Sequence, residues 1–273
     1  MRNQLITLTL FTLIVTVSFC SIAVASLDKG LIVYYPFDEA NGETASDESR
    51  NDNDATLTGS ASWEPNGGKI GGALKLDGTN SSAEDNDGGD YINGLEAFSV
   101  SVWVKSDSVG HDRGIFHGID PGGGDIVFTL RYDSASWEVK GGTNLIKGAI
   151  TTTGGVLPYE SKSNVQTTEW QHLVFAWRSG EQLSLYIDGT LDDDPIFNAD
   201  AKNGEISGAS KFVIGRGAKD GAALGWTGLI DDVRLYNRVL EENEIAELAS
   251  GVLPVEPTEK LATTWAGLKQ KRD

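Results

Sequence analysis

The amino-acid sequence predicts an all-β protein, built as two antiparallel sheets packed face to face, with one short helix near the C-terminal end. Short runs of alternating apolar and polar residues recur along most of the chain, and 33 glycines supply the turns between them. No long stretch repeats its apolar residues every three to four positions, as a large helix would. Together these features favour a β-sandwich.

The alternation is clearest at residues 98–105 (FSVSVWVK), where Phe98 and three valines alternate with Ser99, Ser101, Trp103 and Lys105. One face of such a strand is apolar and belongs in a core. Asp188-Gly189 is a favoured hairpin turn after the strand expected at 183–187. Further strands are expected at 31–37, 72–78, 125–132, 172–177, 211–215 and 228–240.

Residues 240–248 (LEENEIAEL) carry the expected helix, because Leu240, Ile245 and Leu248 fall on one face of it. Gly251 follows as a stop signal. The glutamates between 241 and 247 are expected to form its solvated face. Residues 27–250 are thus interpreted as one domain.

The two ends of the chain differ from this domain. Residues 1–25 have the anatomy of a secretory signal peptide: Arg2, an apolar run, and Ala23 and Ala25 at an A-x-A cleavage site. A membrane anchor is the alternative, but the run is short and no basic cluster follows it. Residues 251–273 form a Pro-containing linker and a basic tail, which is either a frayed end or a docking segment.

Composition excludes several classes of protein. The formal net charge of −18 disfavours nucleic acid and anionic membranes as partners. Cys20, the only cysteine, lies in the predicted signal peptide, so the exported chain has neither disulfides nor thiolate zinc sites. A secreted or cell-surface protein is expected, with no membrane insertion once the signal peptide is removed.

Seven segments, in order, resemble the laminin-G-like, concanavalin-A-like jelly-roll family of exported bacterial proteins. They are LIVYYPFDE (31–39), DESRNDNDATL (47–57), GGALKLDG (71–78), FSVSVWVK (98–105), EWQHLVFAW (169–177), LSLYIDGTL (183–191) and GLIDDVRLYNRVL (228–240). The resemblance implies a two-sheet antiparallel jelly-roll sandwich. Two segments depart from the family pattern and are expected to be long loops: an acidic extension at 79–90 and a Gly/Thr/Ser-rich stretch between Gly141 and Gln166.

Asp231 and Asp232 stand side by side inside the last strand. Alternation with Val233 and Leu235 would point Asp231 inward and Asp232 outward. A buried carboxylate without a partner costs several kcal/mol, on the order of 2–7, so it needs compensation. Calcium, which takes six to eight oxygen ligands, would provide it.

The predicted ligands of this structural calcium are side chains expected to converge if the first and last strands lie together: Asp38, Asp47, Asn51, Asn53 and Asp231. The resemblance supports the placement, since family members carry a structural calcium near the position matching Asp231. The alternative is that Asp231 accepts hydrogen bonds from backbone amides, while Asn51 and Asn53 only shape a turn. Two other acidic segments, 79–90 and 192–195, are interpreted as solvated, although the first could hold a second ion.

Catalytic patterns are missing from the sequence. There is no G-x-S-x-G elbow, no H-E-x-x-H motif and no run of alternating glutamates of the kind that glucanases carry on a strand. His172 beside Trp170 is interpreted as a residue of a sheet face. Trp137 could stack on a sugar ring, although packing in a hairpin explains it equally simply.

The expected function is therefore that of an exported, non-catalytic binding module that recognises a carbohydrate or glycoconjugate through loops at one end of the sandwich. A polysaccharide hydrolase or lyase is the main alternative. A protein-interaction or structural surface domain is the other, so the partner is either a glycan or a surface protein.

Overall fold

The computed structural model describes residues 27–119, 126–136, 138, 140–217 and 224–252. Residues 30–251 form one compact unit; of the second unit, residues 1–29 and 252–273, only 27–29 and 252 are described. The predicted signal peptide (1–25) and the predicted tail from residue 253 onward therefore lie outside the described residues. In the described part of the chain, no helix is long and apolar enough to cross a membrane.

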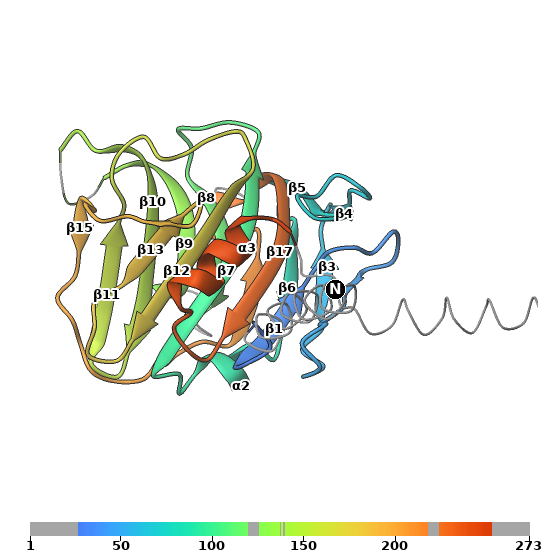
Figure 1. The fold of residues 1–273 in the computed structure, drawn as a ribbon. Coiled ribbons are helices and arrows are strands. Elements are labelled where there is room, and N and C mark those ends of the chain that lie inside the picture. The colour runs from blue at the N-terminus through green and yellow to red at the C-terminus, as the bar shows by residue number, and fades with distance from the viewer. Residues whose placement is uncertain (1–26, 120–125, 137, 139, 218–223, 253–273) are drawn as a thin grey trace, which may run out of the picture. The chain divides into compact units, whose positions relative to one another are not determined.

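Two antiparallel sheets make up the compact unit, as predicted (Figure 1). The eight-stranded sheet runs in the order β14-β13-β12-β7-β17-β5-β4, with β1 paired to β17 beside this path. Its strands are β1 (Leu31–Tyr35), β4 (Ser62–Trp63), β5 (Leu74–Asp77), β7 (Ala97–Ser106), β12 (Gln171–Arg178), β13 (Ser184–Ile187), β14 (Thr190–Leu191) and β17 (Thr227–Tyr236).

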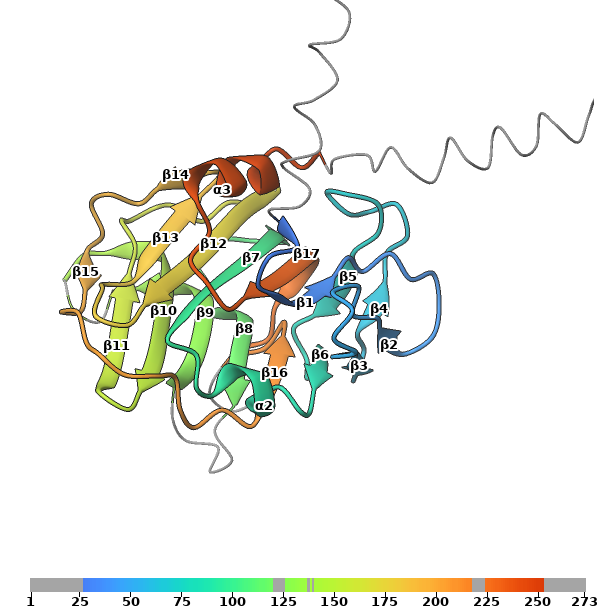
Figure 2. The ribbon, with the colours of Figure 1, turned by 60° about the horizontal axis from the view of Figure 1, so that its bottom comes forward.

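The nine-stranded sheet runs in the order β15-β11-β10-β9-β8-β16-β6-β3-β2 (Figure 2). Its strands are β2 (Thr44–Ala45), β3 (Ala55–Thr58), β6 (Ser82–Asp85), β8 (Arg113–Ile119), β9 (Ile126–Ala135), β10 (Thr143–Thr152), β11 (Gly155–Glu160), β15 (Phe197–Asn198) and β16 (Lys211–Ile214). The described helices are α2 (Gly89–Ile92) and α3 (Glu242–Ala249). Helix α3 contacts β12 and lies in front of it in Figure 1.

The core lies between the two sheets, where the apolar halves of the alternating strands meet. Phe98 on β7 packs edge-on against Phe128 on β9, with ring centroids 4.8 Å apart. Gly148 on β10 leaves room for the ring of Phe175, which a Cβ at that position would strike. The expected hairpin is present too, since Asp188 and Gly189 both have positive φ angles between β13 and β14.

The prediction of a long loop between Gly141 and Gln166 is wrong. This stretch forms the hairpin of β10 and β11, registered from Lys147 opposite Glu160 to Thr152 opposite Gly155. Its threonines and glycines resemble a loop in composition, but Ile146, Ile150 and Leu157 face the core at strand spacing. Threonine is β-branched and favours strands, so the composition was compatible with either structure.

Two acidic segments are less solvated than predicted. The extension at 79–90 contains β6 and the start of α2, and Glu84 and Asp85 are buried in it. In the segment 192–195, Asp192 is buried and accepts a hydrogen bond of 2.7 Å from the hydroxyl of Tyr159. On α3, Glu244 is buried in a capping box and binds Arg238 at 2.6 Å, so one glutamate of the expected solvated face points away from water.

Strand β17 has two partners, end to end, along one edge. Residues 227–230 pair with β5, and residues 233–236 pair with β1, so the first and last strands do lie side by side, as predicted. Asp231 and Asp232 occupy the junction between the two partners. On the opposite edge the register against β7 shifts between Asp231 and Arg234, and Asp232 has a φ of 50°, which makes the junction a β-bulge.

Candidate functional site

The bulge reverses the predicted direction of Asp231. Asp231 lies opposite Trp103 of β7, and residues opposite each other in a ladder share a face. Val233 and Leu235 belong to the core cluster, whereas Asp231 and Trp103 do not. Asp231 therefore lies on the outer face of the eight-stranded sheet. The prediction assumed strict alternation, which the extra residue of the bulge breaks.

Both aspartates are nonetheless buried, and each is held differently. Asp232 forms an ion pair of 3.0 Å with Arg234, which also stacks over the ring of Tyr34 at 4.1 Å. Asp231 accepts a hydrogen bond of 2.9 Å from the backbone amide of Ile70. Burial raises the pKa of Asp231 to about 7, although the amide hydrogen bond from Ile70 counteracts this rise.

Asp38 reaches the same glycine-rich turn as Asp231. Its Oδ1 atom accepts a hydrogen bond of 2.6 Å from the amide of Gly72. The turn is tight: Gly68 donates to the carbonyl of Gly71 at 3.1 Å, and a Cβ at Gly68 would strike the carbonyl of Gly72. Two carboxylates from distant parts of the chain thus hold one turn by its backbone amides.

The other three predicted calcium ligands lie along β1. Asp47 accepts hydrogen bonds from the amides of Tyr34 at 2.8 Å and Asn53 at 3.0 Å. The side-chain amides of Asn51 and Asn53 donate to the carbonyl of Ile32 at 3.0 and 2.9 Å. Their role here is to satisfy the free edge of β1.

The five predicted ligands thus fall into two groups, Asp38 with Asp231 and Asp47 with Asn51 and Asn53. In the described ranges, no three acidic or histidine side chains come together in a geometry suited to a metal. The Oδ1 atom of Asp231 is buried and has no hydrogen-bond partner there, which is the one feature that fits a missing cation.

A different site lies on the outer face of the nine-stranded sheet. Four ionic side chains of β9, β10 and β11 are buried there, and we call them the charged row: Arg131, Asp133, Lys147 and Glu160. Arg131 lies opposite Lys147, and Lys147 lies opposite Glu160. The intervening residues Leu130 and Tyr159 face the core, so the row faces outward.

The members of the charged row neutralise one another. Arg131 binds Asp133 at 2.8 Å, and Lys147 binds Asp133 at 3.4 Å and Glu160 at 3.1 Å. The hydroxyl of Ser136 donates a short hydrogen bond to Glu160. Two cations and two anions leave the row with no net charge, and each ionised group is fixed in position by its neighbours.

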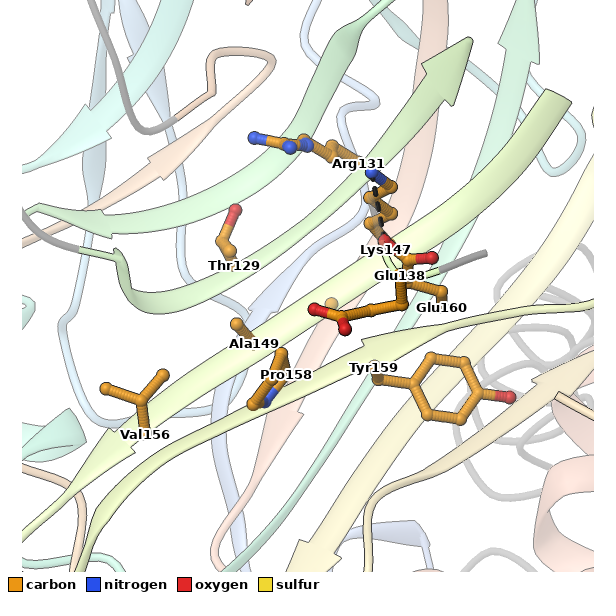
Figure 3. Close-up of a pocket in the computed structure, with 10 residues that line it drawn as sticks. Thr129, Arg131, Glu138, Lys147, Ala149, Val156, Pro158, Tyr159 and Glu160 are labelled. Atoms are coloured by element: carbon orange, nitrogen blue, oxygen red, sulfur yellow. Dashed lines mark ion pairs between the residues drawn. The ribbon is translucent and has the colours of Figure 1, made fainter. Parts of the chain in front are cut away.

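An apolar surface borders the charged row. Val156, Pro158 and Ala149 line one side of a shallow pocket whose other side is formed by Arg131, Lys147 and Glu160 (Figure 3). Val156 is 47% exposed, which is unusual for a large apolar side chain in this protein. The pocket measures about 60 Å³, the space of about two water molecules, so a larger ligand would rest on it rather than enter it.

Two further pockets lie elsewhere. The first, of about 270 Å³, is lined by Asp77, His111, Asp112 and Arg113, but its polar groups already hold loops together. Asp77 accepts hydrogen bonds from Ser60 and Thr79, and Arg113 donates to Ser106 and to the carbonyl of Thr227. The second, of about 310 Å³, lies on the other sheet beside Leu229, Lys75 and Lys105. Neither combines buried ionic groups with an apolar rim.

Sequence reasoning missed the charged row. Its members are separated along the chain, and two of them lie in the stretch that was interpreted as a loop. A usable signal was present: Arg131 and Asp133 alternate with Leu130 and Tyr132, as charges on an outward face do. Trp137, the predicted sugar-stacking residue, lies outside the described residues, whereas its neighbour Glu138 lines the pocket. His172 is a sheet-face residue, as expected, and is hydrogen-bonded to Ser101 at 2.9 Å.

Known structures share this fold. Domain 4 of an extracellular GH43 arabinanase from Geobacillus stearothermophilus, solved with arabinotriose, matches with a TM-score of 0.59 and 24% identity, over 80% of this chain and 98% of that domain. The binding domain of botulinum neurotoxin DC in complex with SialylT matches with a TM-score of 0.56 and 13% identity, over 82% of this chain and 52% of that one. A Trypanosoma rangeli sialidase matches with a TM-score of 0.56 and 22% identity, over 81% and 32%.

At these identities the likeness shows the fold alone, and this chain spans about half of the toxin domain and a third of the sialidase. No curated protein matches the chain by sequence. The family comparison is more specific, because residues 77–246, more than half of the chain, match the laminin G-like family described as the concanavalin A-like lectin/glucanases superfamily. The chain therefore belongs to the concanavalin A-like lectin/glucanase superfamily.

Proposed function

We propose that the chain is an exported, non-catalytic carbohydrate-binding module whose ligand rests on the charged row and its apolar rim. The observation that carries this proposal is the pocket in which Val156 and Pro158 face Lys147 and Glu160. A sugar presents C–H groups on the faces of its ring and hydroxyls at its edge. Such a ligand matches an apolar surface beside fixed donors and acceptors.

The cost of the charged row supports a ligand-binding role. Burying ion pairs is often neutral or unfavourable for stability compared with apolar packing. Arg131, Asp133, Lys147 and Glu160 face outward, away from the core between the sheets. Charged groups fixed by one another need no rearrangement when a ligand arrives, which reduces the entropy lost on binding.

Glycan ligands named for proteins of the same fold also support the proposal. The arabinanase domain was solved with arabinotriose, and the toxin binding domain with SialylT. Export is proposed from the sequence of residues 1–25, which has the arrangement of a signal peptide.

The direct test is binding to a panel of immobilised polysaccharides, followed by calorimetry with the best oligosaccharide. In the double variant Lys147→Met/Glu160→Leu the charged row loses one cation and one anion, and we expect affinity to fall by about tenfold or more, since hydrogen bonds to charged groups contribute about 1.5–3 kcal/mol each. Wild-type protein that binds no glycan but captures a defined surface protein would replace this proposal with the protein-interaction alternative.

Val156→Ser tests the apolar rim. The matched control is Leu191→Ser on β14 of the other sheet, because Leu191 is exposed to a similar extent, 42% against 47%. We expect weaker glycan binding from the Val156 variant and unchanged binding from the Leu191 variant. Equal effects of the two variants would argue against this face as the site.

A polysaccharide hydrolase is the second candidate, because two carboxylic acids, Glu138 and Glu160, line the pocket. Glycosidases use such a pair as acid and base or nucleophile. Glu160, however, is bound to Lys147 and Ser136, so its negative charge is already engaged. Release of new reducing ends from a bound polysaccharide, abolished in Glu160→Gln, would identify an enzyme and overturn the non-catalytic proposal.

We also propose a structural calcium at Asp231, with Asp38 as the second carboxylate on the same turn. The support is the buried Oδ1 atom of Asp231 without a partner among the described residues, together with the chemistry of oxygen ligands. Asp47, Asn51 and Asn53, predicted as further ligands, are instead engaged with β1.

Thermal unfolding tests the calcium, because an ion bound only by the native state raises Tm. We expect chelator to lower Tm and calcium to restore it, and we expect Asp231→Asn to remove the response. An unchanged Tm with chelator would leave the amide-capping role of Asp231 as the full explanation.

A further inference from the structure

A second group of charged residues lies on the same outer face, beside the charged row. Glu84 on β6 is buried and is bound by the Nζ atom of Lys211 at 3.1 Å and by a guanidinium nitrogen of Arg216 at 3.1 Å. His117 on β8 is also buried. We call these four residues the basic corner: Glu84, Lys211, Arg216 and His117.

The strand register joins the basic corner to the sugar pocket. Glu84 lies opposite Val213, Val213 opposite His117, and His117 opposite Thr129. Thr129 lines the pocket of the charged row. Neighbouring strands lie about 5 Å apart, so His117 on β8 and Lys147 on β10 are separated by about 10 Å. One oligosaccharide could contact both.

The charges of the two groups differ. The charged row is balanced, whereas the basic corner holds the cations Lys211 and Arg216 against the single anion Glu84. Although burial raises the pKa of Glu84, the hydrogen bond from Lys211 and the charge of Arg216 lower it overall, so Glu84 is ionised at neutral pH. The corner thus has one excess positive charge in a chain whose formal net charge is −18.

His117 adds an unmet polar atom to the corner. Its Nδ1 atom is buried without a hydrogen-bond partner in the part of the chain that the structure describes. Burial, with the charges of Arg216 and Arg131, lowers the pKa of His117 to about 4. The imidazole is therefore neutral at pH 7, and one of its two nitrogens is a donor.

We propose that the basic corner binds the carboxylate of an acidic sugar unit, in an oligosaccharide whose neighbouring units rest on the charged row. The inference deepens the proposed function and rests on it. Guanidinium and ammonium groups are the usual partners of carboxylates, and a guanidinium offers five N–H donors, more than one glutamate uses. Binding of the carboxylate would also give buried His117 an acceptor.

The test compares an oligogalacturonate with its methyl ester, in which the sugars are the same and the charge is removed. We expect the acid to bind at least about tenfold more tightly than the ester, since each charge-assisted hydrogen bond contributes about 1.5–3 kcal/mol. We expect added salt to reduce this difference, because the interaction is between charges.

Variants separate the two groups of residues. Arg216→Met should abolish the preference for the acid and leave binding of the ester unchanged. Arg178→Met removes an exposed cation from β12 of the other sheet and should change neither. Equal binding of acid and ester to the wild type, or an unchanged preference in Arg216→Met, would overturn the inference while leaving the proposed glycan site intact.

A readout independent of oligosaccharide binding is the NMR signal of the His117 ring during titration with free galacturonate. We expect this signal to shift with galacturonate and not with its methyl ester. Absence of glycan binding altogether would remove the proposed function, whereas a missing shift at His117 beside normal glycan binding would remove only the acidic subsite.

Discussion

The outer faces of the two sheets carry buried charges in opposite ways. On the nine-stranded sheet, Arg131, Asp133, Lys147 and Glu160 pair with one another across three strands, and a pocket lies over them. On the eight-stranded sheet, Asp231 and Asp38 hold a glycine-rich turn, and only Asp232 has an ionic partner on its own strand, Arg234.

The difference also appears in the polar atoms left without partners in the described residues. Around the bulge of β17 they include Asp231 Oδ1, Asp232 Oδ2, His172 Nδ1, Trp103 Nε1 and Tyr236 OH. Such atoms are costly when buried, so this face depends on its few existing contacts. Charges that pair across strands can remain available to a ligand, whereas charges that hold a turn are used for stability.

The largest effect is expected at the bulge. Arg234→Leu leaves Asp232 buried without its cation, and breaking such a pair costs about 3–5 kcal/mol of the free energy of unfolding. Urea unfolding at neutral pH measures this loss. The control is Arg178→Leu, whose partner Glu181 is exposed, and its expected cost is below about 0.5 kcal/mol. Similar losses in the two variants would show that the bulge is not specially dependent on its ion pair.

The next effect is a loss of stability in acid. Burial, with the charges of Arg234 and Lys69, lowers the pKa of His172 to about 3. The unfolded chain, with a histidine pKa near 6.5, then binds more protons than the folded one between about pH 6.5 and 3, so stability falls as pH falls through this window. We expect His172 to account for about 3 kcal/mol between pH 7 and pH 4.

Unfolding measured against pH in His172→Gln checks this prediction. The variant should flatten the curve, whereas exposed His111→Gln should leave it unchanged. His117 contributes in the same direction, since its pKa is also lowered, to about 4. A curve for His172→Gln that superimposes on the wild type would contradict the burial of a neutral imidazole.

The charged row should be much less important for stability. Replacing a buried pair together, as in Lys147→Met/Glu160→Leu, is often neutral within about 1 kcal/mol or stabilising, because both desolvation costs disappear. Asp133 keeps Arg131 at 2.8 Å in this variant. We expect near-wild-type unfolding with reduced glycan binding. A loss of several kcal/mol would make the row structural.

The smallest effect is expected at the basic corner. In Arg216→Met, Glu84 keeps Lys211 and its hydrogen bond from Ser82 at 2.9 Å. The pair is partly exposed, so we expect a change in the free energy of unfolding below about 1 kcal/mol, measured by the same urea series. A larger loss would mean that binding defects of this variant reflect unfolding.

The sequence predicted the sandwich well because alternation is a local signal. The valines of residues 98–105 and the Asp188-Gly189 turn needed no knowledge of the partner strands. The pairing of the first and last strands was also predicted and is confirmed by Tyr35 opposite Val233. The proximity of Asp38 and Asp231 to one turn follows from that pairing.

The binding face was harder to predict because it depends on register between distant segments. Arg131, Lys147 and Glu160 meet only after β9, β10 and β11 pair. The direction of Asp231 depended on a single extra residue, the bulge at Asp232 with its positive φ. Neither property leaves a pattern in a short window of sequence.

The pairing of β1 with β17 also affects how the chain can fold as it is made. Leu31 pairs with Tyr236, about 200 residues later, so β1 has no partner until nearly all of the domain has been synthesised. Closing so long a loop is slow, and an unpaired strand edge invites association with other chains. Newly made chains therefore pass through a stage in which β1 must be kept apart from its neighbours, and a chain cut short before β17 leaves that edge open permanently.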